Sequence, residues 1–356
     1  MCTIVISGLL IFTSAALSLL AQDGGASFTR VAVNQLLLGL LLGSVALIVL
    51  SRMDYRILKS YSPYIFAISV VLSLAVFLPH VGLSLKGASR WLIIGPISFQ
   101  PAELLKFGTV LLLAAVYAAN FRKIETIRYG VLPLCLVAGS AMLILLAQPD
   151  TASGSVIGMA AFGMFFAAGG RLSHIAALMV VGALIIGGAA LKYEHVADRI
   201  KTFINQDADP LGAGFQIQQS LIAVGSGGIT GRGFGQSVQK FSYLPEPIGD
   251  SIFAVAAEEF GFIGSTILVL LFTALGLLAF RIAARAPDPF GGLLVVGLGI
   301  LIVGQSFFNI ASALGLVPLV GVPLIFVSHG GTSLAISLAE VGVILSVSKR
   351  MRQSKS

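Results

Sequence analysis

Residues Leu36–Leu50 read LLLGLLLGSVALIVL, an uncharged run that is apolar on every side of a helix. Residues Ile267–Phe280, ILVLLFTALGLLAF, have the same character. A helix needs roughly 17 to 25 apolar residues to cross a hydrocarbon core of about 30 Å. A membrane barrel would instead show segments of about ten residues with alternating hydrophobicity. These stretches therefore predict membrane-spanning helices.

The composition extends this conclusion to the whole chain. Of the 356 residues, 57% are hydrophobic and only 10% are charged, and the mean hydropathy is +0.99, far above that of a soluble domain. We predict an all-α polytopic membrane protein, one domain over residues 1–356, with about ten spans. The expected spans lie near 4–20, 33–50, 63–79, 102–120, 130–147, 153–169, 174–191, 251–280, 291–312 and 330–348.

The basic residues indicate the topology. Connections near 52–59, 122–128, 171 and 281–285 carry Arg or Lys, the tail KRMRQSKS is basic, and the connections between them carry fewer cations. Because basic loops stay in the cytoplasm, both termini are expected there. This anchoring explains the net charge of +7 better than binding to nucleic acid. The first span has no basic leader or small-residue cleavage site, so we expect it to be retained.

One extracytoplasmic connection, about 192–249, is much longer than an ordinary loop, and such loops usually have a function. Its stretch GFQIQQSLIAVG (214–225) suits a helix lying in the membrane interface. The glycines of GSGGITGRGFGQS (225–237) permit positive φ and close approach of the backbone to a phosphate or sugar, although flexibility is the commoner reason for such a run.

Several charged residues lie at membrane level. Glu103 and Lys106 are three apart, so they share a helix face and can neutralise each other, either for function or to tie two spans together. Arg90 stands beside Trp91 just before a span, where it can anchor the interface or hold the pyrophosphate of a lipid-linked substrate. Lone acids in several spans, and the Gly- and Pro-rich segment 315–333, keep a proton-coupled transporter as a competing class.

Asp250 stands directly before a long apolar run, and two interpretations are open. It can cap the helix that follows, because Asp accepts hydrogen bonds from the free N–H groups of a first turn. It can also act as a general base at the outer membrane face, held there by the stiff Pro245-Glu246-Pro247. A helix N-terminus lowers the pKa of a carboxyl, whereas a base working near neutral pH needs that pKa raised by burial or by neighbouring acids.

Four stretches resemble one known family: RWLIIGPISFQPAELLKF (90–107), QPD (148–150), 214–264, and FFNIASALGLVPLVGVPLIFVSHGGTS (307–333). They are similar to the shape, elongation, division and sporulation (SEDS) family, whose members include FtsW and RodA. The resemblance covers almost the whole chain in the family's order and spacing. The form GQSVQKFSYLPE is more similar to the division branch, FtsW, than to the elongation branch, RodA.

The resemblance implies a ten-span peptidoglycan glycosyltransferase in the bacterial cytoplasmic membrane that polymerises lipid II at the outer face. Its implied partners are a class B penicillin-binding protein and other divisome or elongasome membrane proteins. Asp250 matches the family's essential loop aspartate, and Arg90 matches the arginine before its motif tryptophan. Glu103 and Lys106 match its fourth-span acid and base, and Asp150 matches the acid of its QPD motif. The remaining candidate substrate contacts are Gln100, Lys240 and Glu246.

A base and a phosphate clamp suffice for the implied inverting displacement, and Arg90, Lys240 or a divalent cation, Mg²⁺ or Mn²⁺, is expected to neutralise the leaving pyrophosphate. No other cofactor is expected. The chain departs from the family where Ile248-Gly249 replace a His-Thr pair, where His329 takes a tyrosine's place, and in a shorter leader. A lipid II flippase and a non-catalytic scaffold for the synthase remain alternatives, but polar residues concentrate in the outer loop, which favours chemistry there.

Overall fold

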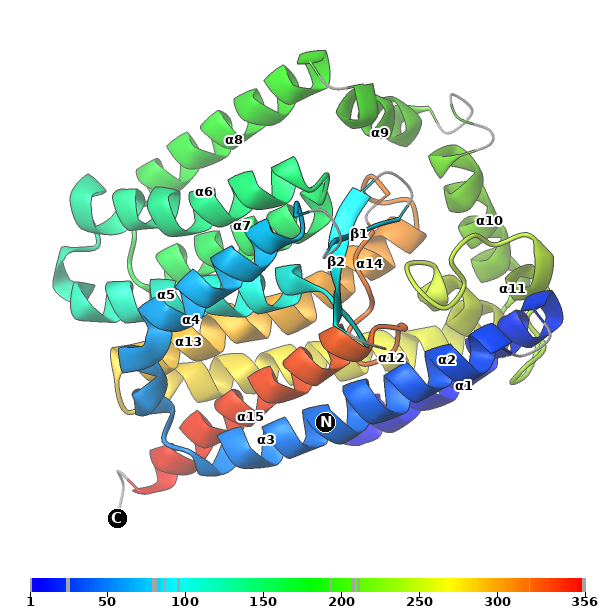
Figure 1. Ribbon diagram of the computed structural model, residues 1–356, viewed down its shortest axis with the longest axis horizontal. Helices are drawn as coiled ribbons and strands as arrows, with labels where there is room; N and C mark the ends of the chain where they lie inside the picture. The colour runs from blue at the N-terminus through cyan, green and yellow to red at the C-terminus, as the bar shows by residue number, and fades with distance from the viewer. Residues whose placement is uncertain are drawn as a thin grey trace. The chain divides into compact units, whose positions relative to one another are not determined.

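The computed structural model describes residues 2–23, 26–78, 82–85, 88–94, 97–192, 194–205, 209, 212–319 and 321–353. The chain is almost entirely helical (Figure 1) and divides into two compact units. Unit 1 comprises 1–35, 176–275 and 305–330, and unit 2 comprises 36–175, 276–304 and 331–356. Each unit is therefore assembled from segments that are far apart in the sequence.

The predicted spans are confirmed as apolar helices. Among the described residues, 8 helices are long and apolar enough to cross a membrane, and two shorter apolar helices, Thr151–Ala167 and Leu172–Leu184, coincide with the remaining two predicted spans. The 8 long ones cover Cys2–Leu20, Val31–Arg52, Tyr55–Ala75, Pro101–Ala119, Ile127–Ala147, Ile252–Ala284, Pro289–Ala313 and Gly331–Met351.

Unit 2 is a helical bundle built around α5 (Pro101–Ala119), most of whose residues are buried. α5 packs against α4 (Tyr55–Ala75), and Gly108 lets the two helices approach closely, since a Cβ there would lie 2.9 Å from the Ser69 hydroxyl. The bundle also contains most of η1 (Asn34–Leu41), α3 (Leu42–Arg52), η2 (Phe121–Lys123), η3 (Ile127–Val131), α6 (Leu132–Ala147), α7 (Thr151–Ala167), α13 (Pro289–Gly299), η5 (Ile300–Gly304) and α15 (Gly331–Gln353).

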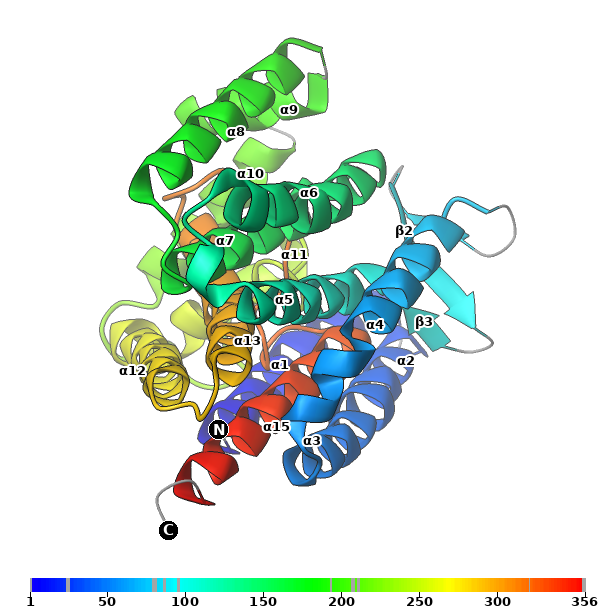
Figure 2. The ribbon, with the colours of Figure 1, turned by 90° about the vertical axis from the view of Figure 1, so that its left-hand side faces the viewer.

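A small sheet that the sequence did not predict lies between α4 and α5 in the chain (Figure 2). It consists of β1 (Gly82–Leu85), β2 (Ala88–Ile94) and β3 (Ile97–Phe99), paired antiparallel in that order. Leu83 pairs with Trp91, and Leu92 pairs with Phe99. The sheet places Arg90 and Trp91 on β2, and the chain leaves β3 directly into Gln100 and α5.

Unit 1 contains α1 (Cys2–Asp23), α2 (Ala26–Val33), most of α8 (Leu172–Lys192), α9 (Glu194–Ile204), α10 (Ala213–Ser226), α11 (Gln239–Ser242) and α14 (Gln305–Ala313). α10 is the helix predicted from GFQIQQSLIAVG. The connection expected to be a long loop therefore contains the helices α9, α10 and α11, joined by irregular stretches.

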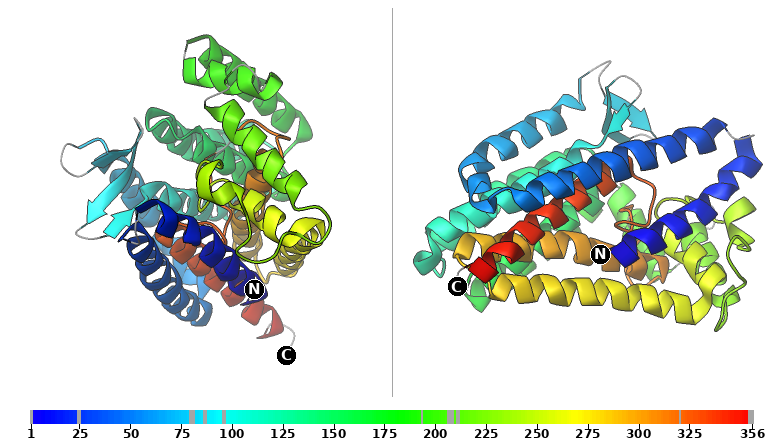
Figure 3. Two further views of the ribbon diagram at one scale, coloured as in Figure 1. Left: turned by 90° about the vertical axis from the view of Figure 1, so that its right-hand side faces the viewer. Right: turned by 90° about the horizontal axis from the view of Figure 1, so that it is seen from below.

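α12 (Ile252–Ala284) begins in unit 1 and is the long yellow helix in the right panel of Figure 3. Gly261 interrupts it with φ 65° and ψ −164°, a conformation open essentially to glycine alone. The backbone groups freed by this kink bond to the glycine-rich loop. Arg232 N donates to Glu258 O at 3.0 Å, and Phe262 N donates to Gly228 O at 2.9 Å.

Candidate active site

Asp250 lies in a turn immediately before α12 and is half-buried. The first helical hydrogen bonds run from Ala254 N and Val255 N to the carbonyl of Ser251, at 3.0 and 3.4 Å. Ser251 is thus the residue directly before the helix, and Asp250 lies one residue before Ser251. The Asp250 carboxylate therefore lies in the turn that leads into the helix. From this position it can act as a general base, and its negative charge can also interact favourably with the helix N-terminus.

The turn closes on Glu246. Gly249 N and Ser251 N both donate to the Glu246 carbonyl, at 3.0 and 3.2 Å. Glu246 itself has a positive φ of 49° and is exposed, a conformation that costs a non-glycine residue energy. Two predicted site residues, Asp250 and Glu246, therefore belong to one short turn.

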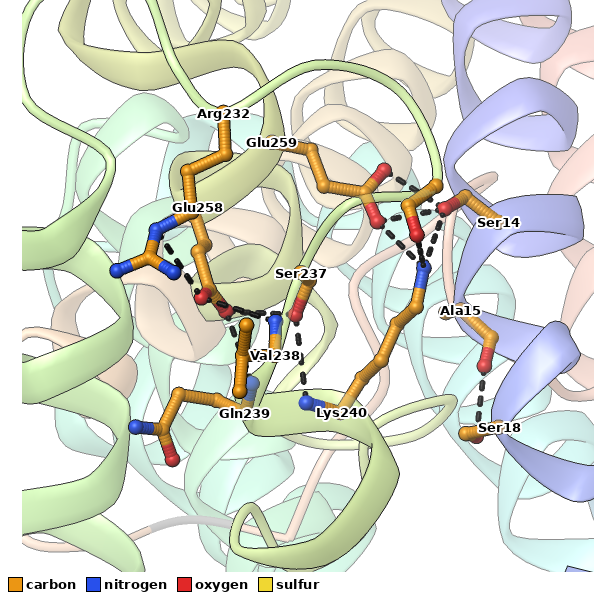
Figure 4. Close-up of polar contacts among 11 residues, drawn as sticks. Ser14, Ala15, Ser18, Arg232, Ser237, Val238, Gln239, Lys240, Glu258 and Glu259 are labelled. Atoms are coloured by element: carbon orange, nitrogen blue, oxygen red, sulfur yellow. Dashed lines mark hydrogen bonds and ion pairs between the residues drawn. The ribbon is translucent and has the colours of Figure 1, made fainter. Parts of the chain in front are cut away.

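Lys240 is buried in an ionic cluster (Figure 4). Its ammonium lies 2.7 Å from Glu259 Oε1 and also donates to the Ser14 hydroxyl at 2.9 Å and to the Gly235 carbonyl at 3.0 Å. The Ser14 hydroxyl reaches both oxygens of Glu259, at 2.6 and 2.7 Å. A direct contact between Lys240 and a pyrophosphate would first have to break this ion pair, so its predicted substrate-binding role stays a prediction.

Glu258 forms the second half of the cluster. Its carboxylate accepts hydrogen bonds from the Ser237 hydroxyl at 2.6 Å and from Val238 N at 3.1 Å, and it lies 3.6 Å from Arg232 Nε. The residues 228–240 are thus fastened to α12 by backbone bonds at the kink and by two carboxylates on consecutive residues.

In unit 2, the predicted pair on α5 is confirmed. Lys106 Nζ lies 2.9 Å from Glu103 Oε1, and both side chains are buried. Glu340 on α15 is also buried and interacts electrostatically with both. Two acids therefore share the neighbourhood of one lysine at membrane depth, where a buried charge needs a partner.

Arg90 contacts the QPD motif that contains Asp150, also within unit 2. The Arg90 guanidinium donates to the carbonyls of Gln148 and Pro149. Asp150 caps α7, accepting from Ser153 N at 3.2 Å and from the Ser153 hydroxyl at 2.8 Å. Arg90 is half-buried and has five N–H donors, so it holds the motif's backbone and keeps donors that an anion can use. Gln100 is half-buried at the start of α5.

The predicted residues thus form four groups, two in each unit. Unit 1 holds the Asp250–Glu246 turn and the Lys240 cluster, and unit 2 holds the Glu103–Lys106 and Arg90–Asp150 regions. Sequence reasoning overlooked the two buried amide side chains of α14, Gln305 and Asn309, although amides inside a span are a recognisable signal. The described part of the chain has no group of three or more His, Cys, Asp or Glu placed to hold a metal ion.

Residues 1–353 match the model of the FtsW/RodA/SpoVE family, described as "Cell cycle protein". The chain belongs to this family. It is 40% identical to stage V sporulation protein E of Bacillus subtilis over 87% of this chain and 85% of that protein. It is 37% identical to FtsW of Geobacter sulfurreducens, named a "Probable peptidoglycan glycosyltransferase", over 88% of this chain and 84% of that protein.

A solved structure confirms the fold. A chain from a peptidoglycan synthase complex that coordinates polymerization and crosslinking superposes with a TM-score of 0.78 at 26% identity, covering 99% of this chain and 98% of that one. This family member is accordingly a multi-pass membrane protein with an almost entirely helical fold.

Proposed function

We propose that this family member is a peptidoglycan glycosyltransferase that polymerises lipid II at the outer face of the cytoplasmic membrane for division or sporulation. The activity named for FtsW of Geobacter sulfurreducens supports the reaction class. The observation that carries the proposal is the Asp250 turn, which presents a half-buried carboxylate at the start of a spanning helix. Both termini lie in the cytoplasm in this proposal, and residues 1–356 act as one domain.

The proposed reaction is an inverting displacement. The 4-hydroxyl of the acceptor's N-acetylglucosamine attacks C1 of the donor's N-acetylmuramic acid and forms the new C1–O bond. The bond between C1 and the phosphate oxygen breaks, and undecaprenyl pyrophosphate leaves with the electron pair. Asp250 takes the hydroxyl proton as general base.

The leaving pyrophosphate needs positive charge as the bond breaks. Arg90 is proposed to supply this positive charge, because its guanidinium is half-buried and planar and matches the geometry of phosphate oxygens. Gln100, Glu103, Lys106 and Asp150 are proposed substrate contacts, and Mg²⁺ or Mn²⁺ is proposed as an additional counter-charge held mainly by the pyrophosphate.

A class B penicillin-binding protein is the proposed partner. Support comes from the similar chain that was solved within a synthase complex coordinating polymerization and crosslinking. A polymerase and a crosslinking enzyme acting on the same strand gain from being held together, because the second step then becomes effectively intramolecular.

The test is polymerisation of labelled lipid II by the purified full-length chain with a class B partner, with products resolved by length on a gel. Asp250→Asn should retain lipid II binding and lose about 10²–10⁴-fold in rate, the usual contribution of a general base. Asp198→Asn is the matched control, since it removes an exposed acid from α9 in the same long connection.

Glycan strands from the wild type and from Asp198→Asn but not from Asp250→Asn support the proposal. If Asp250→Asn polymerises as fast as the wild type, Asp250 is not the base. If none of the proteins polymerises with either cation, transport of lipid II across vesicles becomes the next measurement, because it separates a flippase from a scaffold.

A further inference from the structure

Residues 321–330, which precede α15, are irregular and yet largely buried. Pro318 and Pro323 prevent this segment from continuing a helix, and Val322 and Leu324–Val327 are buried. Backbone N–H and C=O groups in such a place need partners, because water does not reach them. The sequence alone made this segment look like the broken helix of a transporter.

Three buried amide side chains supply those partners. Gln35 donates to the Ser328 carbonyl at 3.2 Å and accepts from Gly330 N at 3.0 Å. Gln305 donates to the Pro323 carbonyl at 3.0 Å, and Asn309 donates to the Val322 carbonyl at 2.8 Å. All of these residues belong to unit 1, so the irregular segment 321–330 is fixed within that unit.

This fixed segment holds the turn that carries Asp250. The carbonyls of three consecutive residues, Ile248, Gly249 and Asp250, each accept a hydrogen bond from it or from α14. The donors are His329 N at 2.7 Å, the Ser328 hydroxyl at 2.7 Å and the Asn309 amide at 2.9 Å, respectively. Ser328 is itself oriented by accepting from Leu324 N at 2.9 Å.

The segment also passes close to the carboxylate. A Cβ added at Gly321 would lie 3.3 Å from Asp250 Oδ2, a tight separation. Asn309 serves both sides at once, because one amide group donates to Val322 in the segment and to Asp250 in the turn. The position of Asp250 therefore depends on residues that lie 59 and more positions along the chain.

We infer that Asn309 and Ser328 are positioning residues that set the orientation of the Asp250 carboxylate for proton abstraction. The inference rests on the proposed function of Asp250 as base. A base works only within hydrogen-bond reach of the proton it takes, and a misplacement of about 1 Å can cost roughly 10²-fold in rate. Because the donors are neutral, they fix the turn without placing another full charge beside the carboxylate.

The test compares Ser328→Ala with Ser18→Ala in the lipid II polymerisation assay. Ser18 is a matched control, since it is a buried serine of the same unit that also donates to a backbone carbonyl at 2.7 Å. Ser328→Ala should lower kcat about 10-fold with KM for lipid II nearly unchanged, and Ser18→Ala should leave both unchanged. Ser328→Thr, which keeps the hydroxyl, should recover most of kcat.

Asn309→Asp gives a harsher second variant, because it replaces the shared donor by an acceptor facing two carbonyls, and it should lower kcat about 100-fold. Each variant is scored at equal content of folded, monodisperse protein. If Ser328→Ala and Asn309→Asp keep the wild-type kcat while Asp250→Asn is inactive, the inference is wrong and the proposed function stands. If Asp250→Asn is as active as the wild type, the proposed function fails first.

Discussion

Two irregular stretches of unit 1 border the start of α12, and they are anchored in different ways. The turn 246–251 is held through backbone carbonyls by a hydroxyl, an amide and a main-chain N–H. The loop 228–240 is held at the Gly261 kink by backbone bonds and by the ion pairs of Glu258 and Glu259. The first region carries the proposed base, whereas the second fastens the glycine-rich loop to the same helix.

Substitutions in the two kinds of anchor should have different effects on the protein. Removing one partner of a buried ion pair leaves an uncompensated charge, so the whole fold loses stability. Removing one neutral hydrogen bond costs only about 1 kcal/mol and leaves the fold standing with a less well placed carboxylate. Variants of the ionic cluster should therefore lower the unfolding midpoint, whereas variants of the turn should lower kcat.

The largest effect is expected from Lys240→Met. It leaves Glu259 buried without its cation, and breaking such a pair typically costs about 3–5 kcal/mol. The measurement is thermal unfolding of the full chain in detergent, followed as loss of monodisperse protein. The midpoint should fall well below that of the wild type.

The double variant Lys240→Met with Glu259→Gln separates charge from packing. Because it removes the stranded charge, it should regain most of the lost stability. A single variant as stable as the wild type would show that the cluster does not anchor the loop. An equally unstable double variant would assign the loss to the packing of the lysine stem.

The fold was predictable in outline because span length and absence of charge are properties of local sequence. The same holds for the Glu103–Lys106 pair, whose spacing of three fixes a common helix face. The sheet at Gly82–Phe99 was missed because its strands are short and their pairing depends on contacts beyond each strand.

The sequence indicated which residues belong to the site better than it indicated which contacts those residues make. The sequence placed Lys240 in the outer loop, and a loop lysine is normally solvated, but its partner Glu259 lies 19 residues further along the chain, inside α12. Likewise, the helix start near residue 251 was predicted correctly, while the Ser328 and Asn309 contacts to the turn depend on how a distant segment folds back.

A smaller effect is expected at the kink itself, from Gly261→Ala. A Cβ there would come within 2.6 Å of the Ile229 carbonyl, and the φ of 65° with ψ of −164° strains any other residue by about 1–3 kcal/mol. The loop should detach from α12, which limited proteolysis between residues 228 and 240 would reveal. Gly225→Ala is the control, because a Cβ there has open space in α10; equal cleavage of both variants would contradict this account.

The smallest expected effect is a dependence of stability on pH through His329, whose ring stacks on Phe12. Burial lowers the pKa of His329, and the Glu246 carboxylate, which acts in the opposite direction, does not outweigh it. The unfolded chain takes up a proton near pH 6.5, whereas folded His329 resists it. The stability is thus complete above about pH 6.5 and is lost as the pH falls through the lower folded pKa.

His329→Tyr removes the titratable imidazole, keeps an aromatic ring and leaves the main-chain bond from residue 329 to Ile248 in place. Comparing unfolding midpoints at pH 7.5 and 5.5 therefore isolates the ring. The variant should lose less stability on acidification than the wild type, and Glu246→Gln should lose more, since it removes the charge that supports protonation. If all three proteins show the same difference between the two pH values, the His329 ring does not sense protons, and its place beside the turn is a matter of packing alone.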